Sequence, residues 1–341
     1  MNIKEIAQEA GVAMSTVSLV LNNKPGVRKE TRARIAKSLV ANGYVIRESA
    51  APERGNGEIR FLRFIASNHV SERNHEFFTD LLNGAERCAR SHGFDFSFAN
   101  VFAEEFGEAV RQLESRECLT GALVLASELT WEGLGPLLRY PGPIVLLDCP
   151  QDYCPLNCVN TDNVGGAFAA VTELYRQGHR KIGFLRGEVE IGGMYGRFEG
   201  YHKAMKHLGL SVNPDHVIRV DTIVDVAAEQ MLSHLRERDA MPTAFFACND
   251  LIAAGAIRAL LQVGYRVPED ISIIGFDDIQ LCSLLTPPLS TMRIDRLRMG
   301  ELGVERLLAL QNGRDDRLRS LMPVTPVLRN SIAPPRESRE T

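Results

Sequence analysis

Polar side chains recur directly after short apolar runs over much of this chain. They are Ser67 and Asn68, Ser127, Asp148, Arg186, Asp221, Asn249 and Asp250, and Asp277 and Asp278. Carboxylates, amides, hydroxyls and arginine forks are the groups that hydrogen-bond polar small molecules. Any single Asp or Asn here could instead cap the helix that follows it. The set as a whole favours a binding cleft.

A second group of chemically active residues lies at the N-terminus and is basic. Residues 1–47 contain eight Lys or Arg residues against three Glu residues, a net charge of +5, whereas the whole chain is −4. The remaining residues therefore carry −9. Each lysine or arginine alone could belong to a solvated helix face, but the asymmetry is typical of a nucleic-acid-binding end on a soluble protein.

The elements that would position the basic residues are three short helices around a tight turn. Asn2 and Glu5 form a capping box at the start of the first helix, and Gly11 can adopt the backbone of a sharp turn. Spacing in the second helix separates two faces. Its inward residues are Val17, Val20 and Leu21, and its outward residues are Met14, Ser15, Ser18, Leu19 and Asn22. A helical surface module without a DNA role would show the same spacing, so the charge favours DNA binding.

From residue 59 onward, apolar strands alternate with helices. This alternation predicts parallel sheets of right-handed βαβ units, in two sets separated near residues 158–163. In such sheets the ligand crevice lies beyond the carboxyl ends of the strands, where the polar residues fall. The fold class is therefore an all-α helix-turn-helix headpiece followed by a two-lobed α/β domain.

Composition limits the other possibilities. The 341 residues lack a signal-peptide pattern and a long apolar run, which predicts a soluble cytoplasmic protein. The seven cysteines include Cys149, Cys154 and Cys158, but no fourth ligand accompanies them, so free thiols are expected and no metal site. Phosphate-binding and hydrolase motifs are missing, which argues against an enzyme with catalytic residues or a cofactor.

The headpiece string IKEIAQEAGVAMSTVSLVLNNKPGV, with TRARI and NGY after it, resembles the DNA-binding headpiece of the LacI family of bacterial transcription regulators. The resemblance implies that the second helix enters the major groove. It assigns base contacts to Met14, Ser15 and Leu19, and backbone-holding roles to Thr16, Ser18 and Asn22. Lys24, Lys29 and Arg32 are expected on phosphates, so that DNA affinity depends steeply on salt.

The linker departs from that family's pattern. The family has a short hinge helix whose leucine wedges into the minor groove, but here Pro52 falls inside the expected helix and Glu53 stands near the leucine position. A carboxylate cannot act as an apolar wedge beside phosphates. We therefore predict an operator bound with little central kink.

The body resembles the family's effector domain, which is related to periplasmic sugar-binding proteins, in segments such as VNTDNVGGAFAAVTELYRQGHRKIGFL and VPEDISIIGFDDI. The resemblance implies a small-molecule effector, by default a sugar or sugar derivative, with a nucleobase or a phosphorylated metabolite as the alternative. A transport-type sugar-binding protein or an enzyme without a DNA role is the remote alternative. The predicted effector-binding residues are Ser67, Phe77, Asp148, Tyr195, Arg197, Asn249 and Asp277.

Together these features predict a repressor that binds a palindromic operator as a homodimer and is controlled allosterically by its effector, with no membrane partner. The expected organisation is a headpiece (1–46), a linker (47–58), an effector domain (59–333) and a disordered tail (334–341). Within the effector domain, lobe 1 covers about 59–160 and 293–320, and lobe 2 about 161–292 and 321–333.

Overall fold

The computed structural model describes residues 3–21, 27–42, 44, 56–66, 75–150, 154–189, 191–236 and 240–336. The chain forms two compact units, Met1–Gly55 and Asn56–Thr341, and each is described by itself. Most of the expected linker, together with Asn22, Lys24 and Ser67, lies outside the described residues, as does the side chain of Lys29. The predictions for these positions remain predictions.

The N-terminal unit contains the three expected helices, α1 (Ile3–Glu9), α2 (Met14–Leu21) and α3 (Lys29–Ala41). Its core is made of apolar side chains from all three helices and the turn after α1: Ile6, Ala7, Ala10, Val17, Val20, Ile35 and Leu39. Gly11 has φ +62°, a left-handed conformation that glycine adopts without steric cost. The predicted inward and outward faces of α2 are confirmed by the burial of Val17 and Val20 and by the 55% exposure of Met14.

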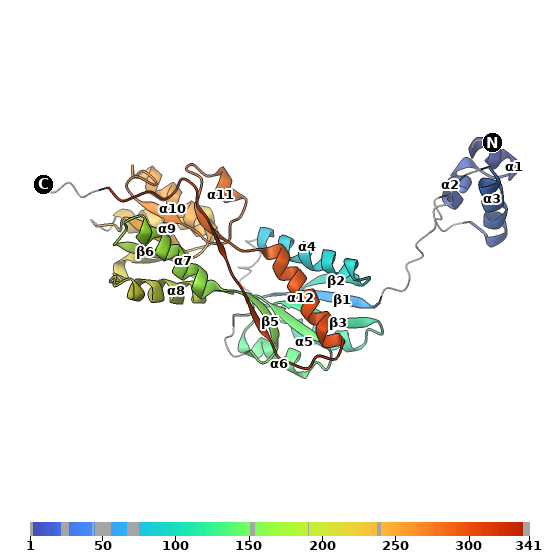
Figure 1. The fold of residues 1–341 in the computed structure, drawn as a ribbon, viewed down its shortest axis with the longest axis horizontal. Helices are drawn as coiled ribbons and strands as arrows, with labels where there is room; N and C mark the ends of the chain where they lie inside the picture. The colour runs from blue at the N-terminus through green and yellow to red at the C-terminus, as the bar shows by residue number, and fades with distance from the viewer. Residues whose placement is uncertain are drawn as a thin grey trace. The chain divides into compact units, whose positions relative to one another are not determined.

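Lobe 1 of the larger unit is a parallel sheet covered by helices on both faces (Figure 1). Within the described residues its strand order is β11 (Arg319–Met322), β5 (Asn157–Thr161), β4 (Ile144–Leu147), β3 (Leu119–Leu125), β1 (Glu58–Ile65) and β2 (Asp95–Phe102). Its helices are α4 (His75–Ser91), α5 (Phe106–Glu114), α6 (Trp131–Arg139) and α12 (Arg296–Gln311). The central strands β3 and β4 are mostly apolar because both faces of the sheet are buried.

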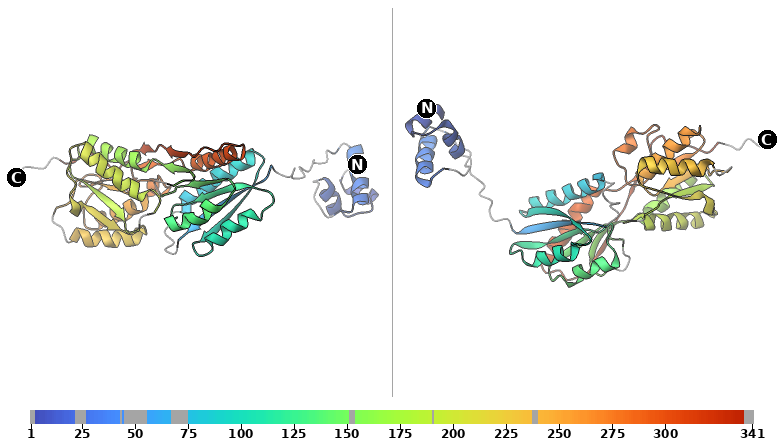
Figure 2. Two further views of the ribbon diagram at one scale, coloured as in Figure 1. Left: turned by 90° about the horizontal axis from the view of Figure 1, so that it is seen from below. Right: turned by 180° about the vertical axis from the view of Figure 1, so that it is seen from behind.

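The helices divide between the two faces of this sheet. Ile59 and Phe61 of β1 pack in one cluster with α4 and α12, whereas Leu62 and Phe64 pack in another with α5 and α6. The backbones of α4 and α12 approach closely, because a Cβ atom at Gly300 would lie 2.1 Å from the Leu81 carbonyl oxygen. Figure 2 shows the two helices side by side.

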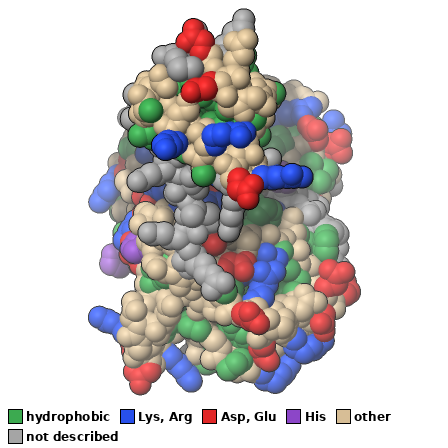
Figure 3. Space-filling model, turned by 90° about the vertical axis from the view of Figure 1, so that its right-hand side faces the viewer, with side chains coloured by type: hydrophobic (Ala, Val, Ile, Leu, Met, Phe, Trp, Pro, Cys, Tyr) green, Lys and Arg blue, Asp and Glu red, His purple; other side chains and the backbone are tan. Residues whose placement is uncertain are grey.

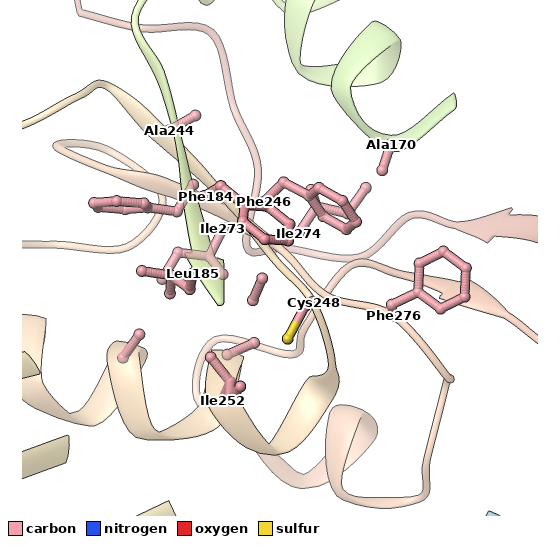
Figure 4. Packing of buried hydrophobic residues seen from close by; sticks show 14 of the residues in the cluster. Ala170, Phe184, Leu185, Ala244, Phe246, Cys248, Ile252, Ile273, Ile274 and Phe276 are labelled. Atoms are coloured by element: carbon pink, nitrogen blue, oxygen red, sulfur yellow. The ribbon is translucent and has the colours of Figure 1, made fainter. Parts of the chain in front are cut away.

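Lobe 2 is a smaller parallel sheet with the order β7 (Val217–Val220), β6 (Ile182–Gly187), β8 (Ala244–Ala247) and β9 (Ser272–Ile274) among the described strands. Around it lie α7 (Asn163–Arg176), α8 (Met194–His207), α9 (Val224–Arg236), α10 (Asp250–Gln262), the short α11 (Leu281–Leu284) and the 3-10 turn η2 (Pro214–His216). Figure 4 shows part of its apolar core, in which the rings of Phe184 and Phe246 lie 5.3 Å apart.

The described chain passes between the lobes at three places. β5 of lobe 1 is followed by α7 of lobe 2, whose N-cap is Asp162. The other two passages run through β10 (Thr291–Arg293) and β12 (Thr325–Val327), which pair antiparallel with each other. The expected change of lobe at 320/321 falls inside β11, which belongs wholly to the lobe 1 sheet.

Part of the expected disordered tail is ordered. His179 lies 2.9 Å from the Ala333 carbonyl oxygen, and Arg336 forms an ion pair with Asp270 at 3.0 Å. Residues 334–336 belong to the described part of the chain, and the ion pair of Arg336 attaches them to lobe 2, so the prediction of disorder was wrong for these three residues. Residues 337–341 lie outside the described part of the chain.

Candidate functional site

The first candidate surface is the outward face of α2. Met14, Ser15 and Ser18 are exposed, and Thr16 and Leu19 are half-buried. Gly11 donates its amide hydrogen to the Gln8 carbonyl, and Val12 donates to that of Ala7, so these bonds close the end of α1 before α2 begins. This arrangement presents a short helix with small polar and flexible apolar side chains, which suits the major groove of DNA.

The third helix, α3, carries further basic side chains. Arg32 is half-buried, whereas Lys37 is exposed. Arg34 donates to the Ala10 carbonyl at 3.0 Å, so it fixes the end of α1. On the face of the molecule drawn in Figure 3, basic and acidic side chains are interspersed. The headpiece is therefore positive by its net charge, and the described residues of this face show no separate basic patch.

The second candidate site is a cavity of about 60 Å³ between the two lobes. Its wall includes residues that follow or end strands in both sheets, as expected for parallel sheets. The lining residues are Arg63, Phe77, Phe78, Leu125, Ser127, Asp148, Ile191, Gly193, Met194, Arg197, Thr222, Asn249, Leu251 and Asp277. Ligand pockets usually measure about 300 Å³ or more, so a ligand needs the lobes or side chains to move.

Arg197 is the central polar group of the lobe 2 wall. Its Nε donates to Asn163 Oδ1 at 2.9 Å, one Nη donates to the Cys248 carbonyl at 2.6 Å, and the other lies 2.9 Å from Asp277 Oδ1. The guanidinium also stacks 4.0 Å from the centre of the Phe276 ring. These contacts fix the guanidinium in one orientation.

Two further polar groups come from the ends of lobe 2 strands. Asn249 follows β8, and its Oδ1 caps α10 by accepting from the Ile252 amide at 2.9 Å, so its Nδ2 is the group that can serve a ligand. Asp277 is 4% exposed, has φ +112°, and its pKa is raised by burial against the opposing charges of Arg197 and Arg296. Asn249 can therefore cap α10 through its Oδ1 and bind a ligand through its Nδ2 at the same time.

Asp250 lies behind the cavity wall, not in it. It is 1% exposed and accepts from the Thr291 hydroxyl at 2.6 Å and the Ile279 amide at 3.1 Å. Burial, followed by the charge of Asp277, raises the pKa of Asp250 to about 7. Its bonds hold β10 and the start of α11 in place, which is a structural role.

Lobe 1 contributes one carboxylate to the cavity. Asp148 Oδ2 accepts from the Ser127 hydroxyl at 2.5 Å, and the residue has φ +55°. Burial raises the pKa of Asp148 to about 6, and the charge of Asp277 adds to the rise, whereas the Ser127 hydrogen bond and Arg197 oppose it. At neutral pH this group can therefore accept hydrogen bonds from a ligand hydroxyl.

The rest of the lobe 1 wall is aromatic and apolar, with one cation. Phe77 and Phe78 begin α4, and Leu125 ends β3. Arg63 of β1 is only 4% exposed, and its guanidinium lies 4.5 Å from the centre of the Phe78 ring. Sequence reasoning missed Arg63; its appearance inside the apolar run RFLRFI was the available signal.

The lobes are in contact on both sides of the cavity. On one side the Gly192 amide donates to the Ser127 carbonyl at 2.6 Å. On the other, the Glu76 carboxylate of α4 accepts from the Gln280 amide at 2.9 Å and lies 3.1 Å from Arg296. We call these the Ser127–Gly192 and Glu76–Gln280 contacts.

The structure brings together Phe77, Asp148, Arg197, Asn249 and Asp277 of the predicted effector residues. Tyr195 does not line the cavity and is 62% exposed, because it lies on the outer side of the first turn of α8, next to the lining residue Met194. Its placement in the site is corrected accordingly. Besides Arg63, sequence reasoning left Leu125, Ile191, Gly193, Met194 and Leu251 unassigned.

All seven cysteines are free thiols. In the described part of the chain, no group of His, Cys, Asp or Glu side chains could hold a metal ion. The helices of the described ranges include none that is long and apolar enough to cross a membrane.

Comparison with known proteins agrees with this arrangement. Residues 2–45 match the model of bacterial regulatory proteins of the lacI family, and residues 171–332 match a periplasmic binding protein-like domain. The HTH-type transcriptional repressor CytR of Escherichia coli (strain K12) is 31% identical over 317 residues, covering 92% of this chain and 90% of CytR. The repressor PurR of Haemophilus influenzae (strain PittEE) is 29% identical over 338 residues, covering 97% and 98%.

A solved structure of the lac repressor dimer bound to operator and the anti-inducer ONPF has a TM-score of 0.70 and 25% identity, covering 98% of this chain and 99% of that one. The expected fold class, a helix-turn-helix headpiece before a two-lobed α/β domain with parallel sheets, is thereby confirmed. With a helical reader at one end and a polar cavity between two lobes at the other, the chain belongs to the LacI family of DNA-binding transcription regulators.

Proposed function

We propose that this protein is a repressor that binds a palindromic operator as a homodimer and responds to a sugar or sugar derivative bound between its lobes. The observation that carries the proposal is the cavity in which Arg197, Asn249 and Asp277 converge opposite aromatic side chains. Such groups hydrogen-bond neighbouring hydroxyls, while an aromatic face covers a sugar ring. In this role the cavity binds its ligand and does not catalyse a reaction of it.

On the DNA side, Met14, Ser15 and Leu19 read base edges, and Thr16, Ser18 and Asn22 hold the backbone. Met14 and Leu19 act by apolar contact, for instance with thymine methyl groups, so Ser15 is the adaptable hydrogen-bonding reader. Lys24, Lys29 and Arg32 neutralise phosphates and supply much of the affinity. A protein with this role works in the cytoplasm, where the chromosome is.

The effector controls DNA binding through an equilibrium between two arrangements of the lobes. The Ser127–Gly192 and Glu76–Gln280 contacts hold the lobes together. A ligand that fits the walls better in one arrangement of the lobes shifts the equilibrium toward it, and the shift changes operator affinity by the same coupling free energy.

The test is selection of DNA sequences from a random pool by the full-length protein, followed by binding measurements at increasing salt. We expect a palindrome with two half-sites. Arg32→Gln should reduce the slope of log affinity against log salt by about one per headpiece. Lys37→Gln removes the same charge from an exposed position of α3 and should leave the slope nearly unchanged.

Failure to enrich any sequence would contradict the proposed operator, and equal slopes for the two variants would contradict the phosphate contact of Arg32. Turnover of a bound sugar would contradict the effector part. Circular-permutation assays on the selected operator test the linker: the composition around Pro52 and Glu53 predicts little central bend.

A further inference from the structure

Two cysteine side chains meet just after the end of β4, next to the lobe 1 wall of the cavity. Cys149 directly follows the lining residue Asp148, is 3% exposed and packs in the apolar cluster that includes α5 and α6. Cys154 packs against the same cluster but is only half-buried. The Cys149 thiol donates a hydrogen bond to the Cys154 sulfur. Reagents from solvent therefore reach Cys154 more easily than Cys149.

The side chain of Asn160 in β5 fixes the backbone of Cys149. Asn160 Oδ1 accepts from the Cys149 amide at 2.9 Å, and its Nδ2 donates to the Cys149 carbonyl at 2.8 Å. Asn160 is itself 5% exposed, and its strand pairs with β4. The Cys149 thiol is thus held beside Cys154 by a rigid part of the sheet.

The surroundings of Cys154 favour its thiolate. The pKa of Cys154 is lowered to about 6, chiefly by the hydrogen bond from Cys149 and against the opposing effect of burial. The backbone at Leu156 and the positive charge of Arg319 contribute to the lowering. The thiolate is the nucleophilic form of cysteine, whose ordinary pKa is about 8.5. Cys154 is therefore mostly ionised at neutral pH.

Other cysteines of the chain have different surroundings. Burial raises the pKa of Cys158 to about 11, and burial also raises the pKa values of Cys88 and Cys282. Thiols of this kind stay protonated at neutral pH and react slowly. Cys118 is exposed and precedes β3, so it serves as an accessible reference thiol. Access to solvent and a stabilised thiolate coincide at Cys154.

We propose that Cys154 and Cys149 form a peroxide-sensitive thiol pair beside the cavity, in which a hydroperoxide oxidises Cys154 and Cys149 then converts the product into an intrachain disulfide. With hydrogen peroxide, the Cys154 thiolate attacks one peroxide oxygen, so that an S–O bond forms and the O–O bond breaks. The sulfur loses two electrons and the peroxide gains them. The departing hydroxide takes a proton from solvent and becomes water.

The second step joins the two sulfur atoms. The Cys149 sulfur attacks the sulfenic sulfur of Cys154, an S–S bond forms and the S–O bond breaks, and the Cys149 proton leaves with the hydroxyl group as water. The disulfide cross-links the backbone next to Asp148, whose side chain lines the cavity. The chemistry is independent of the ligand that the cavity binds.

The experiment maps the disulfide in the full-length protein. The protein is reduced, freed of reductant and treated with hydrogen peroxide, and its remaining thiols are alkylated. Trypsin leaves Cys149, Cys154 and Cys158 on one peptide, residues 140–176, which chymotrypsin cleaves after Tyr153. We expect mass spectrometry to find two chymotryptic fragments joined through Cys149 and Cys154, and dithiothreitol to separate them.

Three variants distinguish the roles of the two thiols. Cys149→Ser keeps a hydrogen-bond donor but cannot form the disulfide, so dimedone should label Cys154 as a sulfenic acid at least fivefold more than in the wild type. Cys154→Ser should give neither product. Cys118→Ser removes the reference thiol and should leave the disulfide yield unchanged. Far-UV circular dichroism verifies that each variant is folded.

The pH profile of alkylation by iodoacetamide tests the thiolate of Cys154 in the wild type. With its pKa at about 6, the rate should rise about twofold between pH 6 and 7.5, against about thirtyfold for a thiol of ordinary pKa. A thirtyfold rise overturns the inference. So does the absence of a disulfide, a disulfide through Cys158 or between two chains, oxidation of Cys118 before Cys154, or the absence of dimedone label in Cys149→Ser.

Discussion

The two walls of the cavity hold their arginines in different ways. On lobe 2, Arg197 is fixed by Asn163, the Cys248 carbonyl and Asp277, all from its own lobe. On lobe 1, Arg63 lies on the Phe78 ring among apolar residues. The lobe 2 wall is therefore organised by polar contacts within its own lobe, whereas aromatic and apolar side chains make up much of the lobe 1 wall.

Removing each guanidinium in turn tests the difference between the two walls most directly. Arg197→Met should lower the free energy of unfolding by about 3 to 5 kcal/mol, because it removes the ion pair that Arg197 forms with the buried Asp277 carboxylate. Arg63→Met should lower it less, because methionine suits the apolar face of β1. Urea unfolding of both variants measures the difference.

A double variant, Arg197→Met with Asp277→Asn, serves as the control. It should recover part of the loss, because the carboxylate that paired with Arg197 is gone. Equal losses for Arg197→Met and Arg63→Met would mean that the two walls do not differ as described.

Closure of the walls depends on Gly192. This residue has φ +51°, and a Cβ atom there would lie 2.5 Å from Asp148 Oδ2. Gly192→Ala should lose about 2 to 3 kcal/mol, from backbone strain of about 1 to 2 kcal/mol and from the clash with the opposite wall. Small-angle X-ray scattering should show a larger radius of gyration.

Gly209→Ala is the matched control for this variant. Gly209 has φ +69° and open space around its Cβ position. Gly209→Ala should therefore lose only the stability that backbone strain costs. If both variants lose the same stability and keep the same radius of gyration, the Ser127–Gly192 contact does not hold the lobes together.

The buried carboxylate behind the lobe 2 wall makes stability depend on pH. With its pKa raised to about 7, folded Asp250 keeps its proton where the unfolded chain has lost it, so its contribution is present at low pH and disappears as pH rises toward 7 and above. Between pH 5 and 7.5 the wild type should lose about 2.5 kcal/mol of unfolding free energy relative to Asp250→Asn, because each pH unit below the folded pKa is worth about 1.4 kcal/mol.

Urea unfolding of the wild type and Asp250→Asn at several pH values gives the slope of the unfolding free energy against pH for each protein. Asp270→Asn is the control: its ion pairs lower the pKa of Asp270 to about 2, so its contribution changes only at much lower pH. A slope in Asp250→Asn identical to that of the wild type would show that Asp250 is ionised in the folded protein at pH 5.

The smallest expected effect concerns the Glu76–Gln280 contact. Glu76→Gln should weaken it by about 0.5 to 1 kcal/mol, because the partly exposed carboxylate loses its charge. A two- to fivefold change in effector affinity follows. Glu86→Gln is the control, because Glu86 pairs with Arg90 within α4 and not across the lobes; equal effects of both variants would exclude the interlobe role.

Sequence alone determined the features that local patterns encode. Helical spacing separated Val17 and Val20 from Met14, and alternation of strands and helices predicted parallel sheets with Asp148, Asn249 and Asp277 at strand ends. These features follow from the 3.6-residue and two-residue periods of the backbone and from the rule that parallel strands end on one edge.

Tertiary structure decided which side chains meet. Tyr195 follows Met194 directly, yet only Met194 reaches the cavity, because the rotation of α8 sends the tyrosine outward. Arg63 lies in a strand whose pattern reads as core, and Glu76 contacts Gln280 from 204 residues away. The spacing of residues along a chain carries no information on the angle at which helices and lobes pack, and that angle places all three of these side chains.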